Sequence, residues 1–269
     1  MSLLLIVNFC RRAPILTKGV TFALLLLLNA HEVSATDLIK VGIYRFPPFV
    51  DFNALGEPEG LSLEMLKRLN EIQDDYRFEP VVTSPGARYA DFSAARFDMM
   101  IFENINWGWT QRKLPIVQTP EFMSGGERYI TLAQPGRTQN YFDDLSNKTI
   151  ACIVGYHYGF AGFKDDPGYL REKFGARLVR RADELILALL SGHADIAVVT
   201  EALLFKNFAD TPGLKGKILV SDRYDQVYSH RVVLRKGIAL SVADMSELMD
   251  RMVTDPAYLS LIENYRGEP

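Results

Sequence analysis

The sequence predicts an α/β protein built from two similar lobes. Two observations lead to this prediction: a strand–helix–strand–helix–strand pattern occurs twice, and a polar stretch with the composition of a linker separates the two occurrences. The chain has 269 residues, which is enough for two domains of ordinary size. Apolar residues make up 48% and charged residues 23%, as in globular proteins and unlike disordered ones.

The first 35 residues have the features of a secretory signal peptide. Basic residues Arg11, Arg12 and Lys18 precede the apolar run 19–28, and segment 33–35 offers small residues for cleavage. The apolar run covers about ten residues, whereas a membrane-spanning helix needs about 20. We therefore predict a cleaved leader and a periplasmic protein. The alternative is an uncleaved membrane anchor.

The charge balance and the cysteines narrow the class of protein further. Lys plus Arg number 30 and Asp plus Glu number 33, so no basic surplus is available to neutralise nucleic-acid phosphates. Cys10 lies in the leader, which leaves Cys152 as the one cysteine of the processed chain. Cys152 lies in the apolar stretch 150–154, so we expect a buried strand cysteine without a disulfide partner.

The first strand–helix pattern begins directly after the leader. The apolar stretch 38–44 predicts a buried strand. Gly60 precedes segment 61–72, in which five apolar residues share one helical face. The remaining elements expected in this part are a strand at 78–82, a helix at 87–95 and a strand at 97–102.

The second pattern follows the linker-like stretch 133–140. We expect strands at 148–154, 177–179 and 194–199, and helices at 169–174, 182–190 and 201–208. Strands at 217–220 and 231–234 and helices at 242–253 and 256–265 complete the expected elements.

Four motifs occur in a fixed order along the processed chain. They are a strand with an aromatic-Pro-Phe turn at 41–49 (VGIYRFPPF), a helix entered through glycine at 60–69 (GLSLEMLKRL), a strand and loop ending in arginine at 97–112, and a terminal helix at 256–267 (PAYLSLIENYRG). In this order they resemble the family 3 bacterial extracellular solute-binding proteins, the periplasmic polar-amino-acid-binding components of ABC importers. The resemblance covers nearly all of the chain after the leader.

The resemblance implies a two-lobe periplasmic-binding-protein-like fold of type II with the ligand cleft between the lobes. Lobe 1 would comprise residues 37–132 plus 229–269, and lobe 2 residues 133–228. Closure would be a hinge motion about the linking strands. A monomer without a cofactor is implied, with a small-molecule ligand and an inner-membrane permease or receptor as partners.

The resemblance also implies a set of ligand-binding residues. Arg112 stands at the position of the arginine that binds the ligand carboxylate, and a planar guanidinium suits a carboxylate well. Phe46 matches the aromatic residue that covers the ligand. Thr200 aligns with the amine-binding aspartate, and the adjacent Glu201 would take this role after a one-residue shift. The alternative for Glu201 is an acid in the first turn of a helix, where it favours the helix dipole.

The chain departs from the family pattern around the expected cleft. Tyr156 stands where the family has a small hydroxyl residue that grips the ligand, and His157 is the one histidine near the expected cleft. The lengthened loop after the third strand carries Glu103 and Trp107. These side chains suit a flat, aromatic or cationic ligand through stacking and cation–π contacts. Core packing is the alternative for any one of the aromatic residues.

The sequence therefore predicts a periplasmic solute-binding protein that captures a small carboxylated, amino-acid-like solute for an ABC importer. Two alternatives remain open: a ligand sensor that serves a receptor without a permease, and an enzyme on the same fold resembling cyclohexadienyl dehydratase. The sequence lacks hydrolase and phosphate-loop motifs, and its histidines are not spaced as metal ligands. We accordingly expect a protein that is not an enzyme and holds no metal.

Overall fold

The computed structural model describes residues 36–256, 258–260 and 262. The predicted signal peptide, residues 1–35, lies outside the described residues, and so does part of the predicted helix 256–265. Within the described ranges, no helix has the length and apolar character needed to cross a membrane. The described residues form one compact unit.

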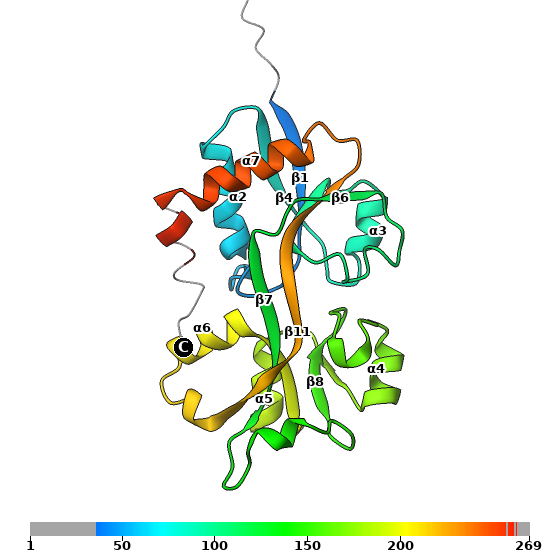
Figure 1. Ribbon diagram of the computed structural model, residues 1–269, viewed down its shortest axis with the longest axis vertical. Coiled ribbons are helices and arrows are strands. Elements are labelled where there is room, and N and C mark those ends of the chain that lie inside the picture. The colour runs from blue at the N-terminus through cyan, green and yellow to red at the C-terminus, as the bar shows by residue number, and fades with distance from the viewer. Residues whose placement is uncertain (1–35, 257, 261, 263–269) are drawn as a thin grey trace, which may run out of the picture. The chain divides into compact units, whose positions relative to one another are not determined.

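A nine-stranded sheet organises the chain. Its strand order is β4-β1-β5-β11-β7-β10-β8-β9, and β6 pairs with β11 beside this path. Strand β11 (Ile218–Arg235) is 18 residues long: its first part pairs with β7 (Met123–Leu132), and its last part pairs with β5 (Met99–Glu103) and β6 (Ile116–Gln118). Figure 1 shows β11 and β7 running side by side through the middle of the chain.

The first sheet half comprises β4, β1, β5, β6 and the end of β11. Strand β1 (Asp37–Ile43) is parallel to β4 (Tyr76–Val82) on one side and to β5 on the other. Helix α2 (Leu61–Glu71) turns its apolar face inward, as its periodicity predicts. The other elements of this half are β2 (Asp51–Phe52), β3 (Pro58–Glu59), α3 (Arg88–Ser93) and α7 (Val242–Val253).

Gly60 begins helix α2 at a position that no other residue fits easily. Its φ is +111°, and a Cβ atom there would lie 2.8 Å from the carbonyl oxygens of Pro48 and Phe49. The glycine therefore brings the start of α2 directly against the turn that follows β1, which holds the aromatic-Pro-Phe motif in place.

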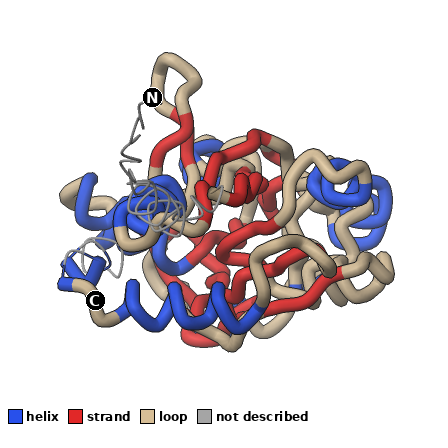
Figure 2. Tube along the Cα trace, turned by 90° about the horizontal axis from the view of Figure 1, so that it is seen from above, coloured by secondary structure: helices blue, strands red, loops and turns tan. Residues whose placement is uncertain are grey.

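The second sheet half comprises β7, β10, β8, β9 and the start of β11. Strand β10 (Ile196–Thr200) is parallel to β8 (Ile150–Ile153) and antiparallel to β7, and β8 is parallel to β9 (Arg177–Val179). Its helices are α4 (Pro167–Phe174), α5 (Asp183–Leu190) and α6 (Glu201–Asp210), with short 3-10 turns at Gln139–Phe142, Gly159–Ala161 and Lys215–Lys217. Figure 2 shows strands in the interior with helices around them.

The expected α/β class with its two strand–helix patterns is confirmed, and two local expectations are wrong. The separate strands expected at 217–220 and 231–234 are one continuous strand, β11. Segment 222–229 between them is polar and carries no apolar run, but pairing with β7 keeps it extended. Strand β7 itself is absent from the prediction, because Gly125 and Gly126 interrupt its pattern.

The expected buried cysteine is confirmed. Cys152 is fully buried in β8 and is a free thiol. Burial, together with the carboxylates of Glu127 and Asp225, raises the pKa of this thiol to about 12. Cys152 is therefore an apolar packing residue rather than a reactive group.

Candidate functional site

A small buried cavity lies where loops from the two sheet halves meet. It has about 10 Å³ of space for the centre of a water-sized molecule, which is about the room of one water. Loops after β1, β5 and β8 supply most of its lining, and β7 and α3 supply one charged residue each. The lining residues are Tyr44, Phe46, Arg88, Trp107, Glu127, Tyr156 and His157. We call this space the aromatic cavity.

The ring of Phe46 is the centre of the aromatic walls. The rings of Trp107 and Tyr156 stand nearly perpendicular to it, at 88° and 79°, each with its centroid 5.7 Å away. Tyr44 lies nearly parallel to Phe46 at 6.0 Å. Edge-to-face packing of this kind is favourable for aromatic pairs. Because the rings come from different loops, it also fixes those loops relative to one another.

Arg88 and Glu103 form an ion pair against this cavity. Both side chains are almost completely buried, and Arg88 Nε lies 3.5 Å from Glu103 Oε1. Trp109 Nε1 donates to Glu103 Oε2 at 2.7 Å, and the guanidinium of Arg88 stacks against the ring of Tyr44 at 4.8 Å. Burial raises the pKa of Glu103, while the Arg88 guanidinium opposes this shift. Glu103 thus serves as the counter-charge of Arg88.

Glu127 is a second buried carboxylate, and its surroundings differ. It extends from β7, is 2% exposed, and accepts one hydrogen bond from Gln226 Nε2 at 3.1 Å. The other end of Gln226 accepts from Trp107 Nε1 at 2.9 Å, which ties Glu127 to the aromatic wall. Burial raises the pKa of Glu127 well above its usual value, and the Asp225 carboxylate adds to the effect. Among the described residues, no cationic side chain forms an ion pair with Glu127.

His157 is buried in the wall of the aromatic cavity. Burial lowers its pKa to about 3, and the nearby Arg88 and Arg112 act in the same direction. The imidazole is therefore neutral at physiological pH. Its Nε2 lies 3.4 Å from the Tyr89 hydroxyl, and its Nδ1 has no hydrogen-bond partner in the described part of the chain.

Arg112 lies beside the aromatic cavity and does not line it. Its Nη2 donates to both carboxylate oxygens of Asp165, at 3.1 and 3.3 Å, and its guanidinium stacks 3.9 Å from the ring centroid of Tyr89. Asp165 precedes α4, so the pair joins loops of the two sheet halves. The arginine that the resemblance assigns to a ligand carboxylate thus already binds a carboxylate of the chain itself.

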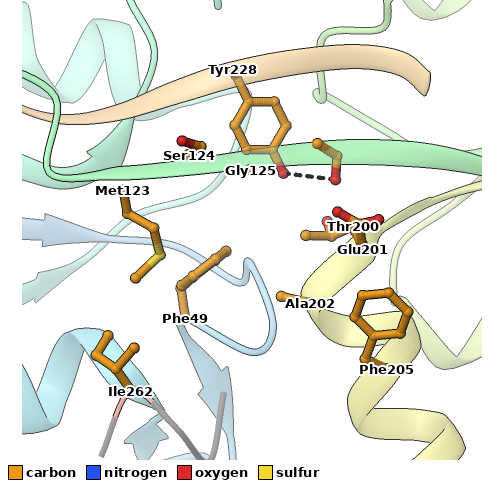
Figure 3. A pocket seen from close by; sticks show the side chains of 11 residues that line it. Phe49, Met123, Ser124, Gly125, Thr200, Glu201, Ala202, Phe205, Tyr228 and Ile262 are labelled. Carbon is orange, nitrogen blue, oxygen red and sulfur yellow. Dashed lines mark hydrogen bonds between the residues drawn. The ribbon is translucent and has the colours of Figure 1, made fainter. Parts of the chain in front are cut away.

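Thr200 and Glu201 line a different space, a groove of about 230 Å³ beside β7 (Figure 3). Glu201 is the first residue of α6, and its carboxylate accepts from Arg128 Nε at 2.9 Å and from the Tyr224 hydroxyl at 3.0 Å. Figure 3 shows Tyr228 and Phe49 on other sides of the same groove. Glu201 therefore already has a cation beside it.

A third space borders both the groove and the aromatic cavity. This small cavity has Thr200 in common with the groove, and it has Glu127 and Tyr156 in common with the aromatic cavity. Glu127 thus lines both small cavities, and one of these cavities also borders the groove.

The structure brings together part of the predicted set of site residues. Phe46, Trp107, Tyr156 and His157 share the aromatic cavity, Thr200 and Glu201 face the groove, Glu103 lies behind Arg88, and Arg112 lies outside. Sequence reasoning missed Tyr44, Arg88 and Glu127. Tyr44 lies only two residues before Phe46, and alternation of side chains along a strand over 127–131 would have indicated Glu127. Within the described ranges, no cluster of three or more potential metal ligands occurs.

Comparison with known proteins supports the fold. The sequence matches no protein-family model and no curated protein. Among solved structures, the substrate-binding protein of an amino acid ABC transporter is 17% identical over 86% of this chain and 100% of its own, with a TM-score of 0.64. The GluR0 ligand-binding core from Nostoc punctiforme, solved with L-glutamate, is also 17% identical, over 86% and 100%, with a TM-score of 0.63.

A third similar structure belongs to an ancestral amino acid-binding protein that is described as a precursor of cyclohexadienyl dehydratase. It is 17% identical over 85% of this chain and 95% of its own, with a TM-score of 0.63. At such identities the likeness shows the fold alone. The chain thus has the two-lobe, type II periplasmic-binding-protein fold that the resemblance predicts.

Proposed function

We propose that the chain is a periplasmic solute-binding protein that captures a small, amino-acid-like solute between its two lobes and delivers it to the permease of an ABC importer. The observation that carries this proposal is the aromatic cavity, in which rings on loops that follow parallel strands of both sheet halves surround the charged groups of Arg88 and Glu127. Ligands of open α/β folds bind at such strand ends, and at interfaces between lobes.

The small volume of the aromatic cavity bears on how a solute would enter. With room for about one water, the cavity is closed, and its walls must part before a solute can bind. The contacts that such a separation would break include the hydrogen bond from the Tyr156 hydroxyl to the Arg45 carbonyl at 2.8 Å, the Arg112–Asp165 pair and the edge-to-face packing of Phe46 on Tyr156. A hinge motion about β7 and β11, which link the two sheet halves, would open the site.

A thermal-shift screen against amino acids, amines and aromatic acids tests the proposal. A solute present at about 100 times its dissociation constant adds about 2.7 kcal/mol to the free energy of unfolding, which raises the melting temperature measurably. The intrinsic fluorescence of Trp107 should change with the same dissociation constant, and Trp107→Phe should remove that signal. If none of these solutes shifts the melting temperature or the fluorescence, the proposed function is wrong.

The paired arginine gives a second test, of the carboxylate site. If a ligand carboxylate binds Arg112, it must displace Asp165, so Asp165→Asn should tighten binding and Arg112→Ala should weaken it. Equal affinities for wild type and both variants would show that Arg112 is not a ligand-binding residue. The protein would still bind its solute, by other groups.

The partner and the enzyme alternative are tested separately. A permease and an ATPase encoded beside the gene would support an importer, whereas a receptor kinase or cyclase would support the sensor alternative. Release of water from a cyclohexadienyl acid by the purified protein would replace the binding proposal with the dehydratase alternative. The structural similarity to a precursor of cyclohexadienyl dehydratase keeps this alternative open.

A further inference from the structure

The charges at the site are unequally compensated. Each arginine at or beside the site already contacts a carboxylate: Arg88 contacts Glu103, Arg112 contacts Asp165, Arg128 contacts Glu201, and Arg45 contacts Asp51. Glu127 is the reverse case, because it is a buried carboxylate with a neutral amide as its partner. The site therefore lacks an unpaired guanidinium for a ligand anion and has an unpaired carboxylate for a ligand cation.

Apart from Arg88, whose charge Glu103 balances, the groups around Glu127 are those that accommodate an organic cation. The rings of Trp107 and Tyr156 each stand nearly perpendicular to the ring of Phe46 as walls, and aromatic faces attract ammonium groups. His157 is neutral, and its Nδ1 is buried without a partner. A neutral imidazole beside the cavity does not repel a cation, whereas a protonated one would.

We propose that the aromatic cavity binds a small organic ammonium ion, with Glu127 as its counter-charge and the rings of Phe46, Trp107 and Tyr156 as its walls, and that the ligand needs no carboxylate. This inference rests on the proposed solute-binding function and changes the expected ligand from a carboxylated solute to an amine. With such a ligand bound, both charged groups that line the aromatic cavity have a partner of opposite charge, as buried charges require: Glu103 for Arg88, and the ligand for Glu127.

A matched pair of probes isolates the positive charge. Choline and 3,3-dimethylbutan-1-ol have the same shape and the same hydroxyl group, but only choline carries a charge. We expect choline to bind the purified protein at least tenfold more tightly than the neutral alcohol, as measured by calorimetry or by tryptophan fluorescence. Addition of a carboxylate, as in trimethylglycine, should not improve the affinity. Equal binding of choline and the alcohol would overturn the proposal.

Variants of the protein isolate the two kinds of recognition. Glu127→Gln should weaken choline binding by at least tenfold, and Phe46→Leu by a smaller factor, because it removes one ring but keeps an apolar side chain. Glu247→Gln on the exposed surface of α7 controls for the change in net charge, and Phe78→Leu in the core of the first sheet half controls for the loss of a ring. Unchanged choline affinity in folded Glu127→Gln would also overturn the proposal.

Failure of this inference is distinguishable from failure of the proposed function. If amino acids bind through their carboxylates and Glu127→Gln does not affect their binding, the solute-binding function stands and the ammonium site is wrong. If amines, amino acids and aromatic acids all fail to bind, the proposed function is wrong, and the ammonium site with it.

Discussion

Replacing Glu127 with glutamine should stabilise the ligand-free protein, although it should weaken ligand binding. The glutamine has nearly the same shape and keeps an acceptor for Gln226 Nε2, but it removes a carboxylate that is 2% exposed and lacks a cationic partner. Leaving a buried polar group unsatisfied costs about 1–3 kcal/mol, and more for a charged one. We therefore expect the free energy of unfolding to rise by about 1–3 kcal/mol at neutral pH.

The effect should depend on pH in a defined direction. The pKa of Glu127 is raised in the folded protein above its ordinary value of 4.5, so the folded state retains a proton that the unfolded state loses. The free energy of unfolding of the wild type therefore falls as the pH rises from 4.5 to the folded-state pKa. Glu127→Gln does not undergo this fall. The difference between the two proteins should be small near about pH 4 and fully developed at higher pH.

Urea unfolding followed by circular dichroism at several pH values measures this difference directly. A gain of about 1–3 kcal/mol corresponds to a melting temperature raised by about 2–12 °C for a domain of this size. Glu247→Gln, at an exposed site, provides the matched control and should change the stability little at any pH. A Glu127→Gln variant less stable than wild type at neutral pH would refute the view that this carboxylate is uncompensated.

Three further outcomes follow from contacts at the site. Gly108→Ala should lower the free energy of unfolding, measured by urea titration, by about 1–3 kcal/mol. The reason is that the φ of Gly108 is +86° and that the new methyl group would collide with the guanidinium of Arg112. Gly216→Ala is the control: it has open space around it and should have little effect. Asp165→Asn should change the free energy of unfolding by under about 1 kcal/mol, less in high salt than in low salt, because its pair with Arg112 is partly exposed. Tyr156→Phe should lower the free energy of unfolding by about 0.5–1.5 kcal/mol, because it removes the hydrogen bond to the Arg45 carbonyl. If this bond helps to hold the site closed, small-angle scattering should show a less compact ensemble for the variant. An unchanged or more compact ensemble would contradict a role in closure.

Much of the fold was predictable because local patterns determine it. Helix α7 has the predicted bounds because its apolar residues recur with helical spacing and Ser241 caps its start, and the short strand β9 also has the predicted bounds. Strands β7 and β11 were not predictable in the same way. They cross the middle of the sheet and are held by pairing with each other over nine residue pairs, and neither strand is apolar along its whole length. Long-range pairing of this kind leaves little local signal.

The sequence predicts the site residues that lie on loops directly after strands, and it does not predict the others. Phe46, Trp107 and Tyr156 meet because the loops that carry them follow β1, β5 and β8, which end on the same side of the two sheet halves' junction. The position of Arg112 was not predictable, because its partner Asp165 is 53 residues away in the chain. Glu127 was missed for the same reason as β7: the strand that directs it inward was not recognised.

The two buried carboxylates of the site show why Glu127 points to a ligand and Glu103 does not. Both are at least 98% buried, and burial raises the pKa of both. Glu103 has Arg88 and the Trp109 indole as partners, so the chain itself supplies what an ionised carboxylate needs. Glu127 has one amide donor, and a glutamine would serve the same packing without the cost of a charge. A buried acid that the fold alone leaves uncompensated is a common feature of functional sites. A ligand cation between the aromatic walls would supply the missing compensation, and the stability lost to Glu127 in the empty protein would then be regained on binding.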